Sequence, residues 1–158
     1  MKKHLIYSLF FLLLSMTSCL TAGLDDLPEF DGADITGVQK VEYRFISDQI
    51  SPSDGKPIVK FVDFPRTTSI DKEKRVISIS VTVPAANPSS FPQNERDKCS
   101  TSELAVMISI STAARVYPVG DAPAFGKPGN WSQPNKYMVQ AADGSKKEWI
   151  VQIVSFKK

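Results

Sequence analysis

The chain has 158 residues, of which 42% are hydrophobic and 23% charged, a composition typical of one globular domain and not of a disordered chain. Its only histidine is His4, which lies in an N-terminal segment that we expect to be removed. The mature chain then has no imidazole, which excludes histidine-dependent triads, general bases and metal sites.

Residues 1–18 have the three parts of a secretory signal peptide. Two lysines and the histidine form a basic start, and the apolar run at 5–14 that follows is too short to span a bilayer. The ending SMTSC at 15–19 resembles a bacterial lipobox, with Met16 where the pattern prefers leucine. The resemblance implies lipidation of Cys19 and cleavage before it. An ordinary cleaved signal, or a cysteine placed there by chance, is the alternative.

Residues 19–34 are expected to form an acidic tether. The tether contains five acidic residues and no basic one: Asp25, Asp26, Glu29, Asp31 and Asp34. Acids close behind a lipidated cysteine resemble the signals that send lipoproteins to the cell surface in Bacteroidetes-type bacteria; a solvated tether is the alternative. We therefore expect an outer-membrane lipoprotein that is surface-exposed or, otherwise, faces the periplasm.

The net charge of the mature chain argues against nucleic acid as a partner. Without the signal, basic and acidic residues balance at 17 each. Binding driven by attraction to phosphates needs an excess of positive charge, so no nucleic-acid partner is expected. The expected association with a membrane is through the lipid on Cys19.

Alternation of apolar and polar residues, the pattern of a strand with one buried face, recurs along the chain. The clearest example is 76–83, and shorter apolar or alternating runs lie at 41–45, 58–64, 104–110, 137–141 and 149–153. At 104–110 a capping-box pattern just upstream leaves a helix as the alternative, but the β-branched residues favour a strand. Asp143-Gly144 between the last two runs predicts a hairpin turn.

These runs predict one all-β domain over residues 35–158. Most prolines lie between the runs, and no segment has a convincing helical period. Six or seven short strands of this kind predict an antiparallel β-sandwich. Two connections, 84–103 and 118–135, are longer than hairpins require, and loops of that length often carry function.

The C-terminal half carries a recognisable set of motifs. These are ISIS at 108–111, ARVYP at 114–118, NWSQP at 130–134, YMVQAADGS at 137–145 and WIVQI at 149–153. They resemble the immunoglobulin-like domains, many of unknown function, of Bacteroidetes-type surface lipoproteins, and also cadherin-like sandwich modules of bacterial surface enzymes. The resemblance implies an immunoglobulin-like sandwich and says almost nothing about a ligand.

The sequence offers little support for any catalytic residue. Asp25 and Asp26 lie in the tether, where nothing holds them at a fixed separation, and the regular spacing of a calcium loop is absent. Cys99 has neither a cysteine partner, once Cys19 is lipidated, nor a histidine to activate it, so we interpret it as a bystander thiol. We predict no enzyme activity, no cofactor and no metal.

Aromatic residues are the remaining lead, because sugar rings stack on them. Trp149 and Tyr137 share faces with core residues and are predicted to be buried. Trp131 lies beside Asn130 in a loop rich in glycine and proline, with Phe125 and Tyr117 as possible neighbours; these four are the predicted ligand-binding residues. A hydrophobic plug over the end of the sandwich is the favoured interpretation of Trp131, and a binding platform is the alternative.

The sequence therefore predicts a lipid-anchored, non-catalytic accessory or binding module that serves glycan or nutrient capture. Its expected partner is a glycan or an outer-membrane transporter complex. The alternative is a structural spacer or adhesion module that contacts other surface proteins. A small hydrolase, or an inhibitor of one, is disfavoured by the missing catalytic groups.

Overall fold

The computed structural model describes residues 29–158, which fold into nine strands and two short helical segments. The bounds in chain order are β1 Ile35–Ile50, β2 Pro57–Asp63, β3 Arg66–Asp71, β4 Val76–Thr82, α2 Gln93–Lys98, the 3₁₀ turn η1 Thr101–Glu103, β5 Leu104–Ile110, β6 Arg115–Val119, β7 Pro128–Gly129, β8 Asn135–Gln140 and β9 Lys146–Lys157. Among these residues, no helix is long and apolar enough to cross a membrane.

The strands form two sheets that pack as an open sandwich. One sheet has the order β2-β1-β5-β7 and the other has the order β3-β4-β9-β8-β6. Neighbouring strands are antiparallel except β4 and β9, which run parallel with Ile77 opposite Val151. The expected all-β sandwich is thus confirmed, with more strands than the predicted six or seven and with one parallel pair. The immunoglobulin-like and cadherin-like assignment stays a resemblance.

The strand predictions can be compared with the sheets directly. Every alternating run lies within or largely overlaps a strand, and the ambiguous segment 104–110 is strand β5. The predicted hairpin joins β8 and β9, with Gly144 at a φ of +86° in its turn. Strands β3, β6 and β7 and helix α2 were not predicted. Strand β6 contains Pro118, which it tolerates because it lies at the edge of its sheet.

The core lies between the two sheets and is made by the inward faces of the alternating strands. Its largest fully buried side chains are Trp131, Trp149, Tyr137, Phe64, Ile35, Ile77, Ile79 and Leu104. No buried side-chain nitrogen or oxygen in the described part of the chain lacks a hydrogen-bond partner. Close packing of these side chains, with the buried polar groups hydrogen-bonded, is the arrangement that stabilises the interior of a sandwich.

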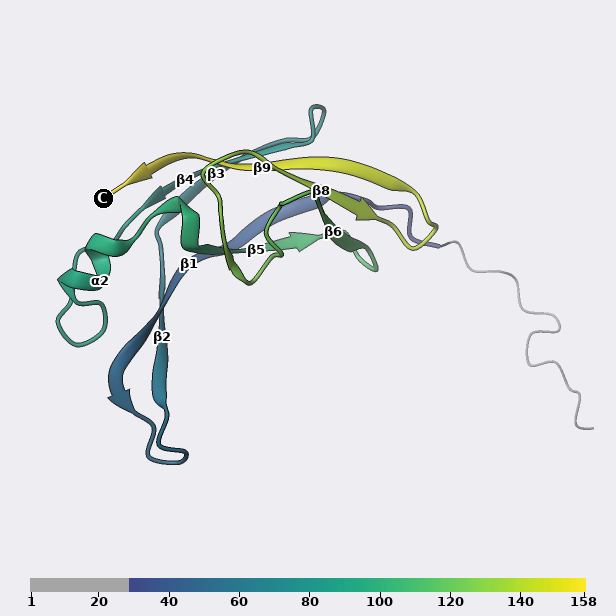
Figure 1. Cartoon of the computed structure of the whole chain (residues 1–158). Coiled ribbons are helices and arrows are strands. Elements are labelled where there is room, and N and C mark those ends of the chain that lie inside the picture. Colours follow the sequence, from purple (N-terminus) through teal and green to yellow (C-terminus); the bar gives the residue numbers. More distant parts are fainter. Residues whose placement is uncertain (1–28) are drawn as a thin grey trace, which may run out of the picture.

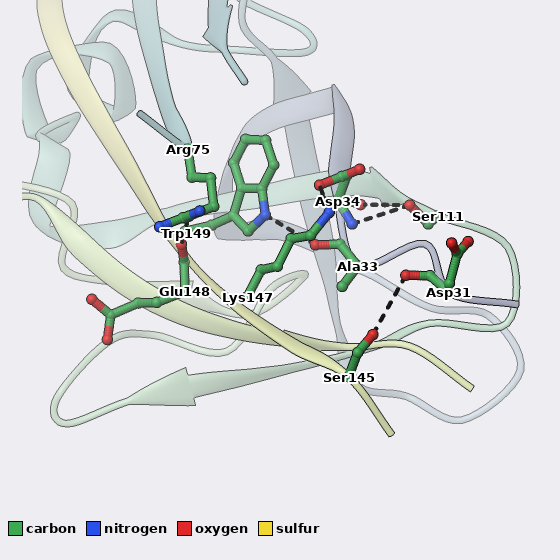
Figure 2. Close-up of polar contacts among 9 residues, drawn as sticks. All are labelled: Asp31, Ala33, Asp34, Arg75, Ser111, Ser145, Lys147, Glu148 and Trp149. Atoms are coloured by element: carbon green, nitrogen blue, oxygen red, sulfur yellow. Dashed lines mark hydrogen bonds and ion pairs between the residues drawn. The ribbon is translucent and has the colours of Figure 1, made fainter. Parts of the chain in front are cut away.

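The folded domain begins before residue 35, the boundary expected from the sequence (Figure 2). Ala33 is fully buried, and its carbonyl oxygen accepts a hydrogen bond of 3.1 Å from Nε1 of Trp149. Asp34 pairs with Lys147 at 3.0 Å, and its backbone exchanges hydrogen bonds with Ser111. The last residues of the expected acidic tether thus belong to the sandwich, because they bridge β9 and the turn after β5.

Strands β1 and β2 extend past the rest of the sandwich as a two-stranded ribbon (Figure 1). β1 has 16 residues, but its pairing with β5 ends where Tyr43 meets Leu104. From there to the tip, β1 pairs only with β2, including Ile46 opposite Val59. The tip of this ribbon and the entry of the chain at residue 29 lie at opposite ends of the molecule (Figure 1).

Candidate functional site

Trp131 is a buried plug, as the favoured sequence interpretation proposed. Its side chain has no exposed surface, and its Nε1 donates a hydrogen bond of 2.9 Å to the carbonyl of Leu104. Its own backbone nitrogen donates to the carbonyl of Thr101. A sugar cannot stack on an indole that is covered on both faces, so Trp131 is not a binding platform.

Phe125 joins Trp131 in the same aromatic cluster. The ring centroids of Phe125 and Tyr137 are 4.1 Å apart, and the ring of Trp131 lies about 6 Å from each. The hydroxyl of Tyr137 donates to the carbonyl of Pro123 at 2.7 Å, and burial raises the pKa of this hydroxyl. The cluster therefore ties the long 118–135 connection to the core, which gives that connection a fixed shape.

Asn130 and Tyr117, the other two predicted residues, lie at the surface that this cluster supports. A pocket of about 390 Å³ opens beside Asn130 at the end of β6. Its lining residues are Val119, Asp121, Ala122, Asn130, Gln133, Pro134, Asn135 and Lys136. Tyr117 is 43% exposed and lies two residues before Val119, on the same face of β6. The structure thus brings Tyr117 next to the pocket wall.

The geometry of this pocket, which we call the Asn130 pocket, is held by local hydrogen bonds. Oδ1 of Asn130 accepts from the backbone nitrogen of Ser132 at 2.9 Å. Nδ2 of Asn135 donates to the carbonyls of Asn130 and Gln133 at 3.1 and 3.2 Å. These contacts fold the backbone over the buried Trp131 and leave the side chain of Gln133 at the surface.

The chemical character of the Asn130 pocket is polar with one aromatic neighbour. It offers amide groups, one carboxylate from Asp121 and one ammonium from Lys136, which pairs with Glu148 at 3.0 Å. Amides both donate and accept hydrogen bonds, as a polyhydroxylated ligand requires. The sequence analysis identified Asn130 and Tyr117 but missed Asp121, Gln133, Asn135 and Lys136. The close spacing of Asn130, Gln133 and Asn135 was the available signal.

A second pocket, of about 200 Å³, lies between the ribbon and the 84–95 segment. Two of its three charged lining residues, Lys60 and Glu95, have partners within the chain. Nζ of Lys60 donates to the carbonyl of Ser89 at 2.9 Å, and Glu95 pairs with Lys98 at 2.7 Å and accepts from the hydroxyl of Tyr43 at 3.3 Å. These contacts hold the 84–103 connection against β1 and β2, and we interpret this pocket as structural.

Cys99 lies beside this second pocket and is 1% exposed. Burial raises the pKa of its thiol to about 11, with a smaller contribution from Glu95, and its Sγ contacts the carbonyl of Glu95 at 3.5 Å. A protonated, covered thiol is a poor nucleophile. The geometry agrees with the interpretation of Cys99 as a bystander.

Between residues 29 and 158, no group of three or more histidine, cysteine, aspartate or glutamate side chains is arranged to hold a metal ion. Cys19 and the pair Asp25 and Asp26 lie outside the described residues. Asp31 and Asp34 are inside them, and Asp34 is engaged by Lys147.

The structure shows that this protein is an all-β sandwich with a polar surface pocket. Comparison with known sequences identifies its family. Residues 35–152 match a family model described as DUF5018-related. The chain belongs to this DUF5018-related family.

Comparison with solved structures gives a second relative. A crystal structure of a Bacteroides fragilis protein, described as a "putative secreted protein", matches with a TM-score of 0.74 and 40% sequence identity. The match covers 83% of this chain and 100% of the other. No curated protein matches this sequence significantly.

Proposed function

We propose that this protein is a lipid-anchored, non-catalytic binding module of the outer membrane or cell surface, and that it captures glycans in the Asn130 pocket. The observation that carries the proposal is a pocket lined by amide side chains, with the exposed ring of Tyr117 two residues from the lining residue Val119 on the same face of β6. Hydroxyl groups of a sugar hydrogen-bond to amides, and its apolar face stacks on an aromatic ring.

The proposed location rests on two further observations. The sequence at 15–19 resembles a lipobox, and the related Bacteroides fragilis protein is described as a "putative secreted protein". The chain enters the sandwich at the end opposite the ribbon (Figure 1). An anchor at Cys19 would therefore hold the ribbon away from the point of attachment.

Binding to an array of defined plant and host oligosaccharides tests the proposed ligand class. We expect the wild-type chain to bind a subset of the array, and Tyr117→Ala and Gln133→Ala each to weaken that binding about tenfold, or ~1.4 kcal/mol. Phe61→Ala is the matched control, because it removes another exposed ring on the other sheet. No binding to any glycan, or binding that both pocket variants retain, would reject the pocket.

The anchor has a separate test. Cys19→Ala should block lipidation and move the protein from the membrane fraction to the soluble fraction, with the glycan affinity of the domain unchanged. A variant that stays in the membrane with unchanged electrophoretic mobility would show that Cys19 is not the anchor, whatever the glycan array reports.

A second candidate function, a spacer or adhesion module that contacts other proteins, is favoured by one different observation. The projecting ribbon carries apolar side chains that the sandwich leaves uncovered. A surface of this kind is typical of protein contacts and is not needed for glycan capture.

A further inference from the structure

The hydrogen bonds that shape the Asn130 pocket leave a defined set of amide groups for a ligand. Oδ1 of Asn130 accepts from a backbone nitrogen, and the amide nitrogen of Asn135 donates to two backbone carbonyls. Among the described residues, no hydrogen bond engages Nδ2 of Asn130, Oδ1 of Asn135 or the side-chain amide of Gln133. The pocket therefore offers one donor, one acceptor and one amide that can do both.

A carboxylate completes this set of polar groups. Asp121 lines the pocket from the turn that follows β6. In that turn the backbone nitrogen of Ala122 donates to the carbonyl of Val119, and Gly120 has a φ of +63°, which suits glycine. Within residues 29–158, no ion pair includes Asp121. Its carboxylate is therefore free to accept hydrogen bonds from a ligand.

The other charged residue of the pocket is already neutralised. Lys136 lies opposite Val119 in the pairing of β6 with β8, and its ammonium pairs with the carboxylate of Glu148 on β9 at 3.0 Å. The charges of Lys136 and Glu148 cancel, and the charge of Asp121 remains. The Asn130 pocket therefore has a net negative charge.

These groups match a ligand that donates hydrogen bonds as well as accepting them. A carboxylate only accepts, so Asp121 requires hydroxyl or N–H donors, which the hydroxyls of a neutral sugar supply. The carboxylate of an acidic sugar cannot donate, and it also repels Asp121. At a separation of ~6 Å and an effective dielectric constant of ~40, this repulsion corresponds to about a tenfold loss of affinity.

We propose that Asp121 makes the Asn130 pocket selective for neutral saccharides over acidic ones. This selectivity rests on the proposed function and narrows its ligand class. Tyr117 and Val119 share one face of β6, so the apolar face of the sugar would lie along β6. Its hydroxyls would then meet the carboxylate of Asp121 and the amide of Gln133.

An array that holds neutral and acidic members of the same glycan classes tests the selectivity. Matched pairs are oligogalacturonides with their methyl esters, and sialylated glycans with their desialylated forms. We expect the wild-type chain to bind the neutral member of a pair about tenfold more tightly than the acidic one. Asp121→Asn removes the charge and keeps the size of the side chain. It should raise the affinity for the acidic members and reduce the ratio to about threefold or less.

The matched control is Glu73→Gln. It removes one exposed carboxylate from the turn between β3 and β4, at the opposite edge of the same sheet. The ratio should stay at its wild-type value in this variant. In the wild-type chain, the ratio should shrink as NaCl rises from about 50 mM to about 500 mM, because salt screens the repulsion.

Two groups of outcomes separate the selectivity from the proposed function. Acidic members bound as tightly as neutral ones, or a preference that Asp121→Asn leaves unchanged, would overturn the selectivity and leave the glycan pocket in place. A preference for acidic members that Lys136→Gln abolishes would also overturn it and assign Lys136 to an anion. No binding at all, or binding that Tyr117→Ala and Gln133→Ala both retain, would reject the proposed function and the selectivity with it.

Discussion

Nε1 of Trp131 donates a hydrogen bond of 2.9 Å to the backbone carbonyl of Leu104, the first residue of β5. Through this contact, the long connection between β6 and β8 is fastened to the sheet that contains β1 and β5. Trp131, for which a binding platform was the alternative interpretation, therefore fixes the connection that lines the pocket in which we place the sugar.

Trp131→Ala should lower the free energy of unfolding by about 3–5 kcal/mol, because it leaves a cavity under the 118–135 connection. Urea unfolding followed by circular dichroism measures the loss. Trp131→Phe retains much of the packing and removes the hydrogen bond to Leu104, so a smaller loss of about 1–3 kcal/mol is expected. A loss below ~1 kcal/mol for the alanine variant would contradict a fully buried indole.

Residues 29–34 should contribute to stability although they precede the first strand. A chain that begins at residue 35 leaves the buried Nε1 of Trp149 without the carbonyl of Ala33, at a cost of about 1–3 kcal/mol relative to a chain that begins at residue 29. Asp34→Asn is the control, because its partly exposed ion pair with Lys147 is worth only ~0–1 kcal/mol. Equal midpoints of thermal unfolding for the two chain lengths would place the domain boundary at residue 35.

Gly144→Ala should destabilise the fold through backbone conformation alone. A β-carbon at Gly144 meets nothing within 4 Å, but the φ of +86° is unfavourable for an L side chain. We expect a loss of about 1–2 kcal/mol in chemical denaturation. At Gly37 an added β-carbon also has open space, and the backbone φ is not positive. Gly37→Ala should therefore change the stability less than Gly144→Ala does. A neutral Gly144→Ala variant would argue against the left-handed turn.

Stability should fall in alkaline solution as Cys99 and Tyr43 ionise. Burial raises the pKa of Cys99 from 9.0 to about 11 and, with Glu95, that of Tyr43 from 10.0 to about 12. Above pH 9 the unfolded chain loses the thiol proton first, which favours unfolding, and the loss grows until pH 11. Each group contributes at most ~1.4 kcal/mol per pH unit.

Urea unfolding between pH 8 and pH 11 measures this dependence. Cys99→Ala should have a shallower fall in unfolding free energy with pH than the wild type, with the residual slope due to Tyr43 and to Tyr137, whose pKa burial also raises. If the two proteins have the same slope, the thiol of Cys99 ionises as readily in the folded chain as in the unfolded one.

Local patterns were sufficient for much of the fold. Alternation at 76–83 and 104–110 predicts strands because the side-chain period of two is a local property of an extended backbone. Asp143-Gly144 predicts its hairpin for a similar reason, since the turn requires a positive φ within a few residues. The burial of Trp149 and Tyr137 also followed from the faces they share with neighbouring apolar residues.

Other features depended on contacts between distant segments. The parallel pairing of β4 with β9 joins residues more than 70 positions apart, and no local pattern encodes which strand becomes the neighbour. Strand β3 lacks alternation because it lies at a sheet edge, where half of its residues are exposed and none is buried. Ala33 looked like part of a tether, because its burial depends on Trp149, far along the chain.

The candidate site was also predictable only in part. Asn130 and Tyr117 were identified from the sequence, but the full set of residues that line the pocket was not. Trp131 turns inward because Leu104 offers a carbonyl and Phe125 and Tyr137 offer rings. Val119 and Gln133 line one pocket only because β6 pairs with β8. Periodicity reports which face of one strand is apolar, whereas a pocket forms from several segments, and only the packing of the two sheets brings those segments together.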